Sequence, residues 1–185
     1  MTNLARKGGL AASIILIILG VGAVAVGVAG RDTVRSDLAR EQIVGTPDSA
    51  IPGQKVDTGS EAKDFAAVMR KHTLEATGNQ TYAQMGRFLD ESGKPTGDEA
   101  AAAKDPKTGE PVANPARDIW ISSTAFQTAL NTAYFAESVA TFVIAVGGAL
   151  LLVGIGFLVL TIRLLKPEPA TGRAARTGSA AVAAG

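Results

Sequence analysis

The chain contains no cysteine and only one histidine among its 185 residues, and aromatic residues make up 5% of it. Without cysteine it can form no disulfide, carry no cysteine-linked lipid and offer no thiolate to a metal. One histidine is too few for the two-histidine, one-carboxylate triad of non-haem iron enzymes. No set of residues is spaced for catalysis. We therefore predict no catalytic residues, no metal site, no cofactor and no enzymatic activity.

Charged residues are also missing from two long stretches, residues 8–30 and residues 138–162. Each is longer than the roughly 20 apolar residues that cross the hydrocarbon core of a bilayer as a helix. A chain this short has no second layer that could cover two helices that are apolar all round. We therefore predict a short N-terminal tail at residues 1–9 and transmembrane helices at 10–30 and 138–162.

The first stretch also has features of a cleaved secretory signal. Arg6 and Lys7 precede it, and Gly27-Val28-Ala29 offers the small residues that a signal peptidase needs. However, the apolar part from Leu10 to Ala29 exceeds the roughly 7 to 15 residues of a signal sequence. The length therefore favours an uncleaved anchor, and a mature N-terminus near residue 30 would contradict it.

The charges beside the spans predict their orientation. The N-terminal tail has two basic residues and no acid, and residues 163–185 have four basic residues and one acid. Residues 31–137 hold 12 basic and 16 acidic residues, but long segments translocate largely regardless of charge. We expect both termini in the cytoplasm, residues 31–137 outside, and a disordered basic tail at 163–185. The acidic outer segment disfavours nucleic acid as a partner.

The outer segment reads as helix interrupted by one loop. The first helix should continue through residues 31–43, and a second helix should cover 61–78, where Gly78 is suited to a left-handed C-cap. Asn114 followed by proline predicts the start of the last helix, which should reach residue 165. Residues 81–89 could add a short turn of helix, and residues 91–114 should be a flexible loop. The predicted fold is all-α: an antiparallel hairpin of two transmembrane helices that projects outside the membrane, with a small helical cap.

Glycines in the two spans predict where helices pack. Small residues allow close approach of another helix, and the candidate packing residues are Gly20, Gly27, Gly147, Gly148 and Gly154. Alternatively, these glycines only reflect how common glycine is in membrane helices. No ionisable residue lies inside either span, which argues against a channel or pump made by this chain alone. Besides the lipid bilayer, we expect a membrane-protein partner or a second copy of the chain.

The segment HTLEATGNQTYAQM contains the only histidine and one of the two tyrosines. In a helix that starts at Glu61, His72 falls on the side of Phe65 and Met69, which predicts a packed residue of the core or its boundary rather than a ligand. The alternative is an exterior module that binds a small ligand. Its candidate surface cluster consists of His72, Thr73, Tyr82 and Trp120.

That segment and the stretch NTAYFAESVATFVIAVGGALLLVGIGFLVL also carry a resemblance. Together with the basic N-terminus and the first span, they resemble a group of small two-span actinobacterial membrane proteins of uncharacterised function. The resemblance extends over about two thirds of the chain and implies a bacterial plasma membrane location. Proteins of this group often carry the automatic label aromatic ring-opening dioxygenase, which one histidine does not support. The sequence thus favours an accessory or structural membrane subunit.

Overall fold

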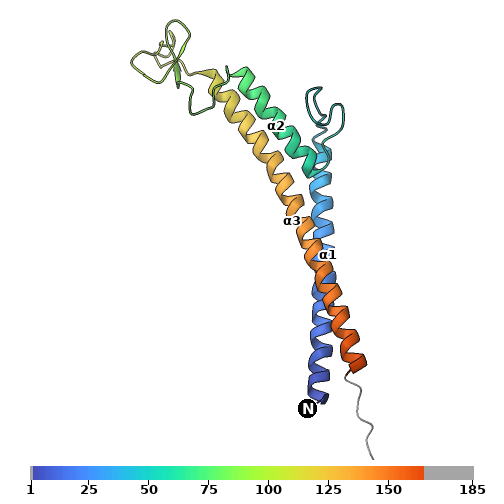
Figure 1. Cartoon of the computed structure of the whole chain (residues 1–185). Coiled ribbons are helices and arrows are strands. Elements are labelled where there is room, and N and C mark those ends of the chain that lie inside the picture. Colours follow the sequence, from blue (N-terminus) through green and yellow to red (C-terminus); the bar gives the residue numbers. More distant parts are fainter. Residues whose placement is uncertain (1, 165–185) are drawn as a thin grey trace, which may run out of the picture. The chain divides into compact units, whose positions relative to one another are not determined.

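The computed structural model describes residues 2–164 of the chain, and the side chains of residues 4–163. It is mostly helical, with α1 (Thr2–Arg40), α2 (Gly59–Ala76) and α3 (Pro115–Leu164), and two short strands, β1 (Phe88–Leu89) and β2 (Pro95–Thr96) (Figure 1). The predicted helical class is therefore confirmed. The tail after Leu164, which we expected to be disordered, lies outside the described residues.

The chain forms two compact units, and both long helices contribute to each of them. Of the described residues, unit 1 contains 2–24 and 145–164, and unit 2 contains 25–144. Helices Leu4–Arg40 and Pro115–Arg163 are long and apolar enough to cross a membrane. Large apolar side chains on both helices are exposed, for example Ile18 at 64% and Leu152 at 75%.

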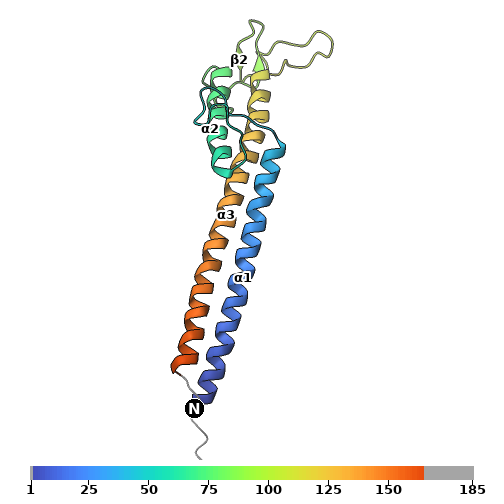
Figure 2. The same ribbon diagram turned by 90° about the vertical axis from the view of Figure 1, so that its right-hand side faces the viewer.

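In unit 1, the first part of α1 and the last part of α3 lie side by side and antiparallel (Figure 2). The buried positions of unit 1 carry small residues at intervals of seven. They are Ser13 and Gly20 on α1, and Gly147, Gly154 and Thr161 on α3. A seven-residue interval keeps one face of a helix against its neighbour. Because those positions carry little or no side chain, the two backbones come close together.

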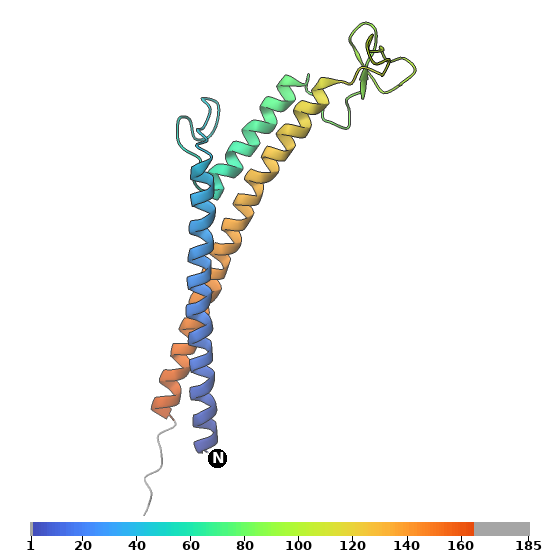
Figure 3. The ribbon, with the colours of Figure 1, turned by 180° about the vertical axis from the view of Figure 1, so that it is seen from behind.

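Unit 2 is held together by an apolar core under α2. Helix α2 lies along the first part of α3 (Figure 3), and the rings of Phe65 and Phe126 meet edge to face with centroids 6.5 Å apart. Loop residues that follow α1 complete this core. Its buried members are Leu38, Ile51, Val56, Ala62, Phe65, Ala66 and Leu130.

The predicted helix boundaries in unit 2 follow from local capping. Thr58 is the N-cap of α2 and forms a capping box with Glu61, and Gly78 after the helix has φ +63°. At the start of α3, the backbone N–H of Ala116 donates to Asn114 Oδ1 over 3.1 Å. The capping side chains form hydrogen bonds with backbone N–H groups that the start of a helix leaves unpaired. Gly78 adopts the left-handed conformation that ends a helix. The predicted end near Gly78 and the predicted start at Pro115 are confirmed.

The first helix ends earlier than expected. It stops at Arg40, and Gln42 takes a left-handed backbone conformation with φ +52°. The chain then folds back on itself, because Val56 N–H donates to Ile43 O over 3.0 Å. This return places Ile51 and Val56 in the core, so burial of loop residues outweighs a helical continuation through residue 43.

Residues 88–113 contain β-structure that the sequence did not predict. Strand β1 pairs antiparallel with β2, and further bridges join Phe88 to Ala113 and Lys104 to Pro111. The Asp90 carboxylate accepts the backbone N–H groups of Ser92 and Lys94, which closes the turn between the strands. Short polar side chains stabilise such turns by bonding their own backbone. The expectation of a segment without secondary structure is wrong, while its flexibility stays a prediction. Residues 81–89, where we expected a short turn of helix, contain no helix: residues 81–85 make one hydrogen-bonded turn, and residues 88–89 belong to β1.

Candidate functional site

The predicted packing glycines of unit 1 lie where α1 and α3 come closest. A Cβ atom at Gly20 would lie 2.8 Å from Gly147 O and 2.9 Å from Leu151 N. A Cβ atom at Gly147 would lie 2.8 Å from Val24 N, and one at Gly154 would lie 2.9 Å from Ile17 Cγ1. Real Cβ atoms essentially never come within 3.0 Å of such neighbours. Gly20 and Gly147 therefore accept only glycine without a shift of the helix backbones, whereas at Gly154 the side chain of Ile17 would have to move.

The other two predicted glycines differ from each other. In unit 2, a Cβ atom at Gly27 would lie 2.6 Å from Ile144 Cγ1 and 2.9 Å from Ala140 O. At Gly148, a Cβ atom would meet nothing within 4 Å. Gly148 follows Gly147 and therefore points about 100° around α3, away from the contact. The structure thus places Gly27 between the helices and Gly148 outside the contact that we expected it to join.

The predicted surface cluster separates into two groups of side chains. His72 and Thr73 line a shallow pocket of about 610 Å³ together with Asp118 and Ser122. Tyr82 and Trp120 do not line this pocket. The structure therefore does not assemble one site from the four residues.

His72 lies half-buried at the edge of the buried face of α2. Its Nε2 is 3.0 Å from Asp48 Oδ2, which also accepts a hydrogen bond from Lys71 Nζ over 2.8 Å. The bond from Lys71, helped by those from Thr46 and His72, holds the pKa of the Asp48 carboxyl well below its usual range. His72 is thus a boundary residue that helps attach the loop containing Asp48 to α2.

Thr73, not His72, faces the neighbouring helix. Its hydroxyl donates to Met69 O over 2.6 Å and also forms a hydrogen bond with the Ser123 hydroxyl of α3. The side chain is buried, so these bonds satisfy a polar group inside the packed region. Thr73 therefore contributes to helix packing at the edge of this pocket.

Trp120 and Tyr82 hold the end of α2 and the turn after it against α3. The buried indole N–H of Trp120 donates to Thr77 Oγ1 over 3.0 Å and to Gln80 O over 2.8 Å. The ring of Tyr82, 41% exposed, lies 3.8 Å from the Arg117 guanidinium carbon. Both contacts bridge segments distant in sequence, which is a structural role.

Glu137 forms an ion-pair cluster that the sequence did not single out. Its Oε1 accepts from Arg31 Nε over 3.0 Å and from Arg35 Nε over 2.8 Å, and Gly59 N–H donates to Oε2. The Glu137 side chain is only 10% exposed. Burial raises the pKa of the Glu137 carboxyl, but the bonds from Gly59, Arg31 and Arg35 outweigh burial and lower it below its ordinary value. One carboxylate thus ties α1, α2 and α3 together.

A sequence signal for this cluster does exist. Arg31 is the first charged residue after the uncharged stretch of α1, and Glu137 is the last one before the uncharged stretch of α3. Arg31 and Arg35 are four residues apart and so share a helix face. In an antiparallel pair of helices these opposite charges lie at the same level, which would have predicted their pairing.

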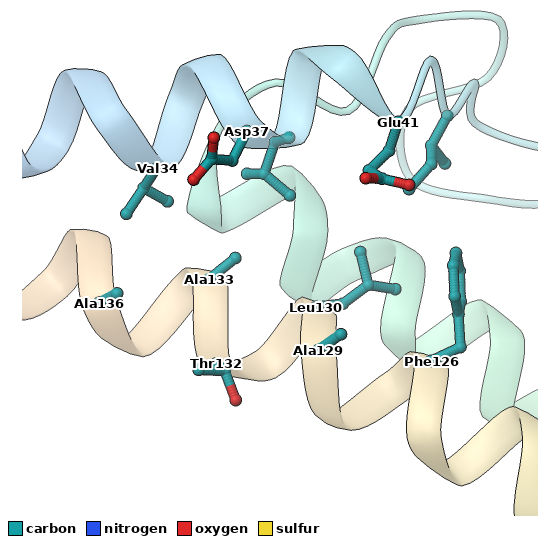
Figure 4. A pocket seen from close by; sticks show the side chains of 11 residues that line it. Val34, Asp37, Glu41, Phe126, Ala129, Leu130, Thr132, Ala133 and Ala136 are labelled. Carbon is teal, nitrogen blue, oxygen red and sulfur yellow. The ribbon is translucent and has the colours of Figure 1, made fainter.

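An open apolar groove also lies in unit 2, between the last turns of α1 and the first part of α3 (Figure 4). Its volume is about 460 Å³. Asp37 at the end of α1 and Glu41 just after it lie on one side of the groove, and Phe126 and Leu130 extend from α3 (Figure 4). The remaining lining residues are Val34, Leu38, Ile43, Ala129, Thr132, Ala133 and Ala136. Contacts between positions about 90 residues apart create this groove, so no local pattern indicated it.

Within residues 2–164, no group of three or more histidine, cysteine, aspartate or glutamate side chains could hold a metal ion. No protein-family model, curated protein or solved structure matches the chain.

Proposed function

We propose that this chain is a two-pass protein of a bacterial plasma membrane, with both termini in the cytoplasm and residues 31–137 outside. The observation that supports insertion is the exposed apolar surface of both long helices, which includes Ile18 of α1 at 64% and Leu152 of α3 at 75%. Soluble monomers rarely expose apolar patches of such extent. Lipid would cover these side chains, and an antiparallel helix pair would continue beyond the membrane surface.

Within that membrane, we propose a non-enzymatic role as an accessory subunit of a larger membrane complex. The contact between α1 and α3 already contains four of the five predicted packing glycines, so these are not available to a partner. They are Gly20, Gly27, Gly147 and Gly154. The open groove between α1 and α3 is the surface that favours docking, because Val34, Ile43 and Phe126 line it. Apolar grooves of this kind receive the apolar face of an amphipathic helix.

The charges at the groove indicate the chemistry of the partner. Asp37 and Glu41 line one side of it; Asp37 also pairs with Arg40 over 3.3 Å, and among the described residues Glu41 makes no salt bridge. Acidic groups beside an apolar surface complement an amphipathic helix that carries a basic residue. We therefore assign the groove to such a helix from a partner membrane protein.

The test combines crosslinking with a pair of positions on different faces of α3. Ala129 lines the groove, whereas Thr124 is exposed on the same helix, about 140° around it, and does not line the groove. A photo-crosslinking residue at position 129 should capture a defined protein in native membranes, and the same residue at 124 should not. Ala129→Trp, which fills the groove, should abolish co-purification of that protein in mild detergent, and Thr124→Trp should not. A chain that elutes as a partner-free monomer, or equal capture from both positions, would refute the proposal.

A second candidate function is small-ligand binding outside the membrane, which the shallow pocket beside His72 and Thr73 favours. A ligand that binds only the folded protein raises its melting temperature by mass action. A thermal-shift screen of the detergent-solubilised chain against divalent metals and small metabolites should then show a shift that Ser122→Trp removes. A screen without any stabilising compound would eliminate this candidate.

A further inference from the structure

A second pocket of unit 2 lies beside the Glu137 ion-pair cluster. Its volume is about 350 Å³, and three helices line it. Helix α1 contributes Arg31 and Arg35, the start of α2 contributes Ser60, and α3 contributes Tyr134, Ser138 and Thr141. Two guanidinium groups and several hydroxyl groups therefore surround one small cavity.

The level of this pocket along the helices gives its position relative to the membrane surface, and the inference therefore rests on the proposal that the chain spans the membrane. Arg31 directly follows the uncharged residues 8–30, and Glu137 directly precedes the uncharged residues 138–162. Charges at the two ends of a span lie at the level of the lipid headgroups. The pocket would thus open where phospholipid phosphate groups are concentrated.

The ion pairs leave donors available for a further anion. Arg31 and Arg35 each use Nε–H to bind Glu137 Oε1. Among the described residues, neither arginine donates from a terminal nitrogen to another residue. A guanidinium has five N–H groups in a fixed fork, so a bond at Nε orients the remaining donors without using them. Glu137 thus orients the guanidinium groups of Arg31 and Arg35. The two positive charges of these arginines exceed the single negative charge of Glu137.

Neighbouring charged residues add to the positive charge around the pocket. Lys63 Nζ lies 4.6 Å from the centre of the Tyr134 ring, which lines the pocket. The nearby Glu61 carboxylate accepts the backbone N–H groups of Asp57 and Thr58, so local donors already occupy it. The pocket therefore combines net positive charge, oriented donors and hydroxyl groups.

We infer that this pocket binds the phosphate group of an anionic phospholipid headgroup. Guanidinium forks match the geometry of phosphate oxygens and can bind two of them at once. Ser60, Tyr134 and Ser138 line the same pocket, and their hydroxyl oxygens offer acceptors to the polyol part of a headgroup such as glycerol. Free phosphate shares the same chemistry, but the place at the membrane surface favours the lipid.

The experiment measures lipid binding to the full chain by native mass spectrometry in mild detergent, with phosphatidylglycerol and with phosphatidylcholine. Wild type should prefer phosphatidylglycerol, and Arg31→Gln with Arg35→Gln should weaken its binding about fivefold for each arginine. Arg40→Gln is the matched control, since Arg40 lies on the same helix outside the pocket and should leave binding unchanged. Equal binding of the two lipids, or an equal effect of Arg40→Gln, would refute the inference.

Two further measurements separate guanidinium recognition from charge alone and lipid from free phosphate. Arg31→Lys with Arg35→Lys retains both charges opposite Glu137 but removes the planar forks, so it should bind about threefold or more weakly with an unchanged melting curve. Binding as tight as wild type would contradict recognition by the guanidinium groups. Inorganic phosphate should compete poorly, and full competition at equal concentration would assign the site to free phosphate instead.

Failure of this inference can be distinguished from failure of the proposed function. Alkaline carbonate extraction of native membranes tests insertion alone. A chain that is released by carbonate refutes insertion, and with it both proposals. A chain that stays in the membrane but shows no preference for phosphatidylglycerol refutes only the headgroup site.

Discussion

Adding one methyl group at Gly20 tests the close contact of α1 and α3 in unit 1. The new Cβ atom would lie 2.7 Å from Leu151 Cγ, 2.8 Å from Gly147 O and 2.9 Å from Leu151 N. Two of these neighbours are backbone atoms of α3, which cannot rotate away as a side chain can. Ordinary contact begins at 3.4 Å, so the helices must separate by about 0.6 Å at this point.

A separation of this size has a predictable energetic cost. A gap of 0.5–1 Å removes about a quarter to a half of the dispersion energy of the atoms that it affects. Overpacking of this kind typically lowers the free energy of unfolding by about 1–3 kcal/mol. Against this, alanine is a better helix former than glycine by up to about 1 kcal/mol, so the clash must be measured against a control.

Gly22 supplies that control, because a Cβ atom there would meet nothing within 4 Å. Gly22→Ala changes helix propensity alone, whereas Gly20→Ala adds the clash. In mixed detergent micelles titrated with SDS and followed by circular dichroism, Gly20→Ala should unfold with a free energy about 1–3 kcal/mol lower than that of Gly22→Ala. Equal stabilities of the two variants would show that the backbones do not come this close.

Three other outcomes follow from unit 2. Glu137→Gln removes the carboxylate that binds two arginines and Gly59 N–H, so it should lower the free energy of unfolding by about 1–3 kcal/mol in the same assay, whereas the exposed Glu75→Gln should change it by less than about 0.5 kcal/mol. Because its bonds lower the pKa of Glu137 below the ordinary 4.5, this stabilisation is complete above that pH and is lost as the pH falls through the lower folded value. Wild type should therefore lose more stability than Glu137→Gln on acidification, and parallel losses would contradict the ion-pair cluster. Trp120→Phe should lower the free energy of unfolding by about 1 kcal/mol, because it removes the indole N–H that donates to Thr77 Oγ1 and Gln80 O, and Tyr82→Phe, which keeps its ring beneath Arg117, should change it little.

The helix ends were predictable because their causes lie within a few residues. Asn114 before a proline indicates the start of α3, and Gly78 indicates the end of α2. The end of α1 was not predictable in this way, since burial of Ile51 and Val56 by the returning loop stops the helix at Arg40. The β-structure of residues 88–113 had a local cause too, the turn at Asp90, but helical periodicity and helix caps do not indicate such a turn.

The candidate site was less predictable than the fold. Thr73 was assigned to a surface cluster, yet it packs against Ser123 of α3. Which residues a helix face contacts depends on how the neighbouring helix is aligned with it, and this alignment cannot be read from the sequence of one helix. The groove beside Phe126 and the pocket beside Arg35 both arise from such alignments.

The two long apolar helices follow directly from the amino-acid sequence. Uncharged stretches of this length leave helix as the structure that satisfies every backbone group without water. Which positions of the two helices meet depends instead on how the helices align in space. Gly147 and Gly148 are identical neighbours in the sequence, but the alignment of α3 with α1 places Gly147 against Val24 and leaves Gly148 open. Likewise, the charge of Glu137 was visible at once, whereas its burial among two arginines and the start of α2 depends on three helices converging on one carboxylate.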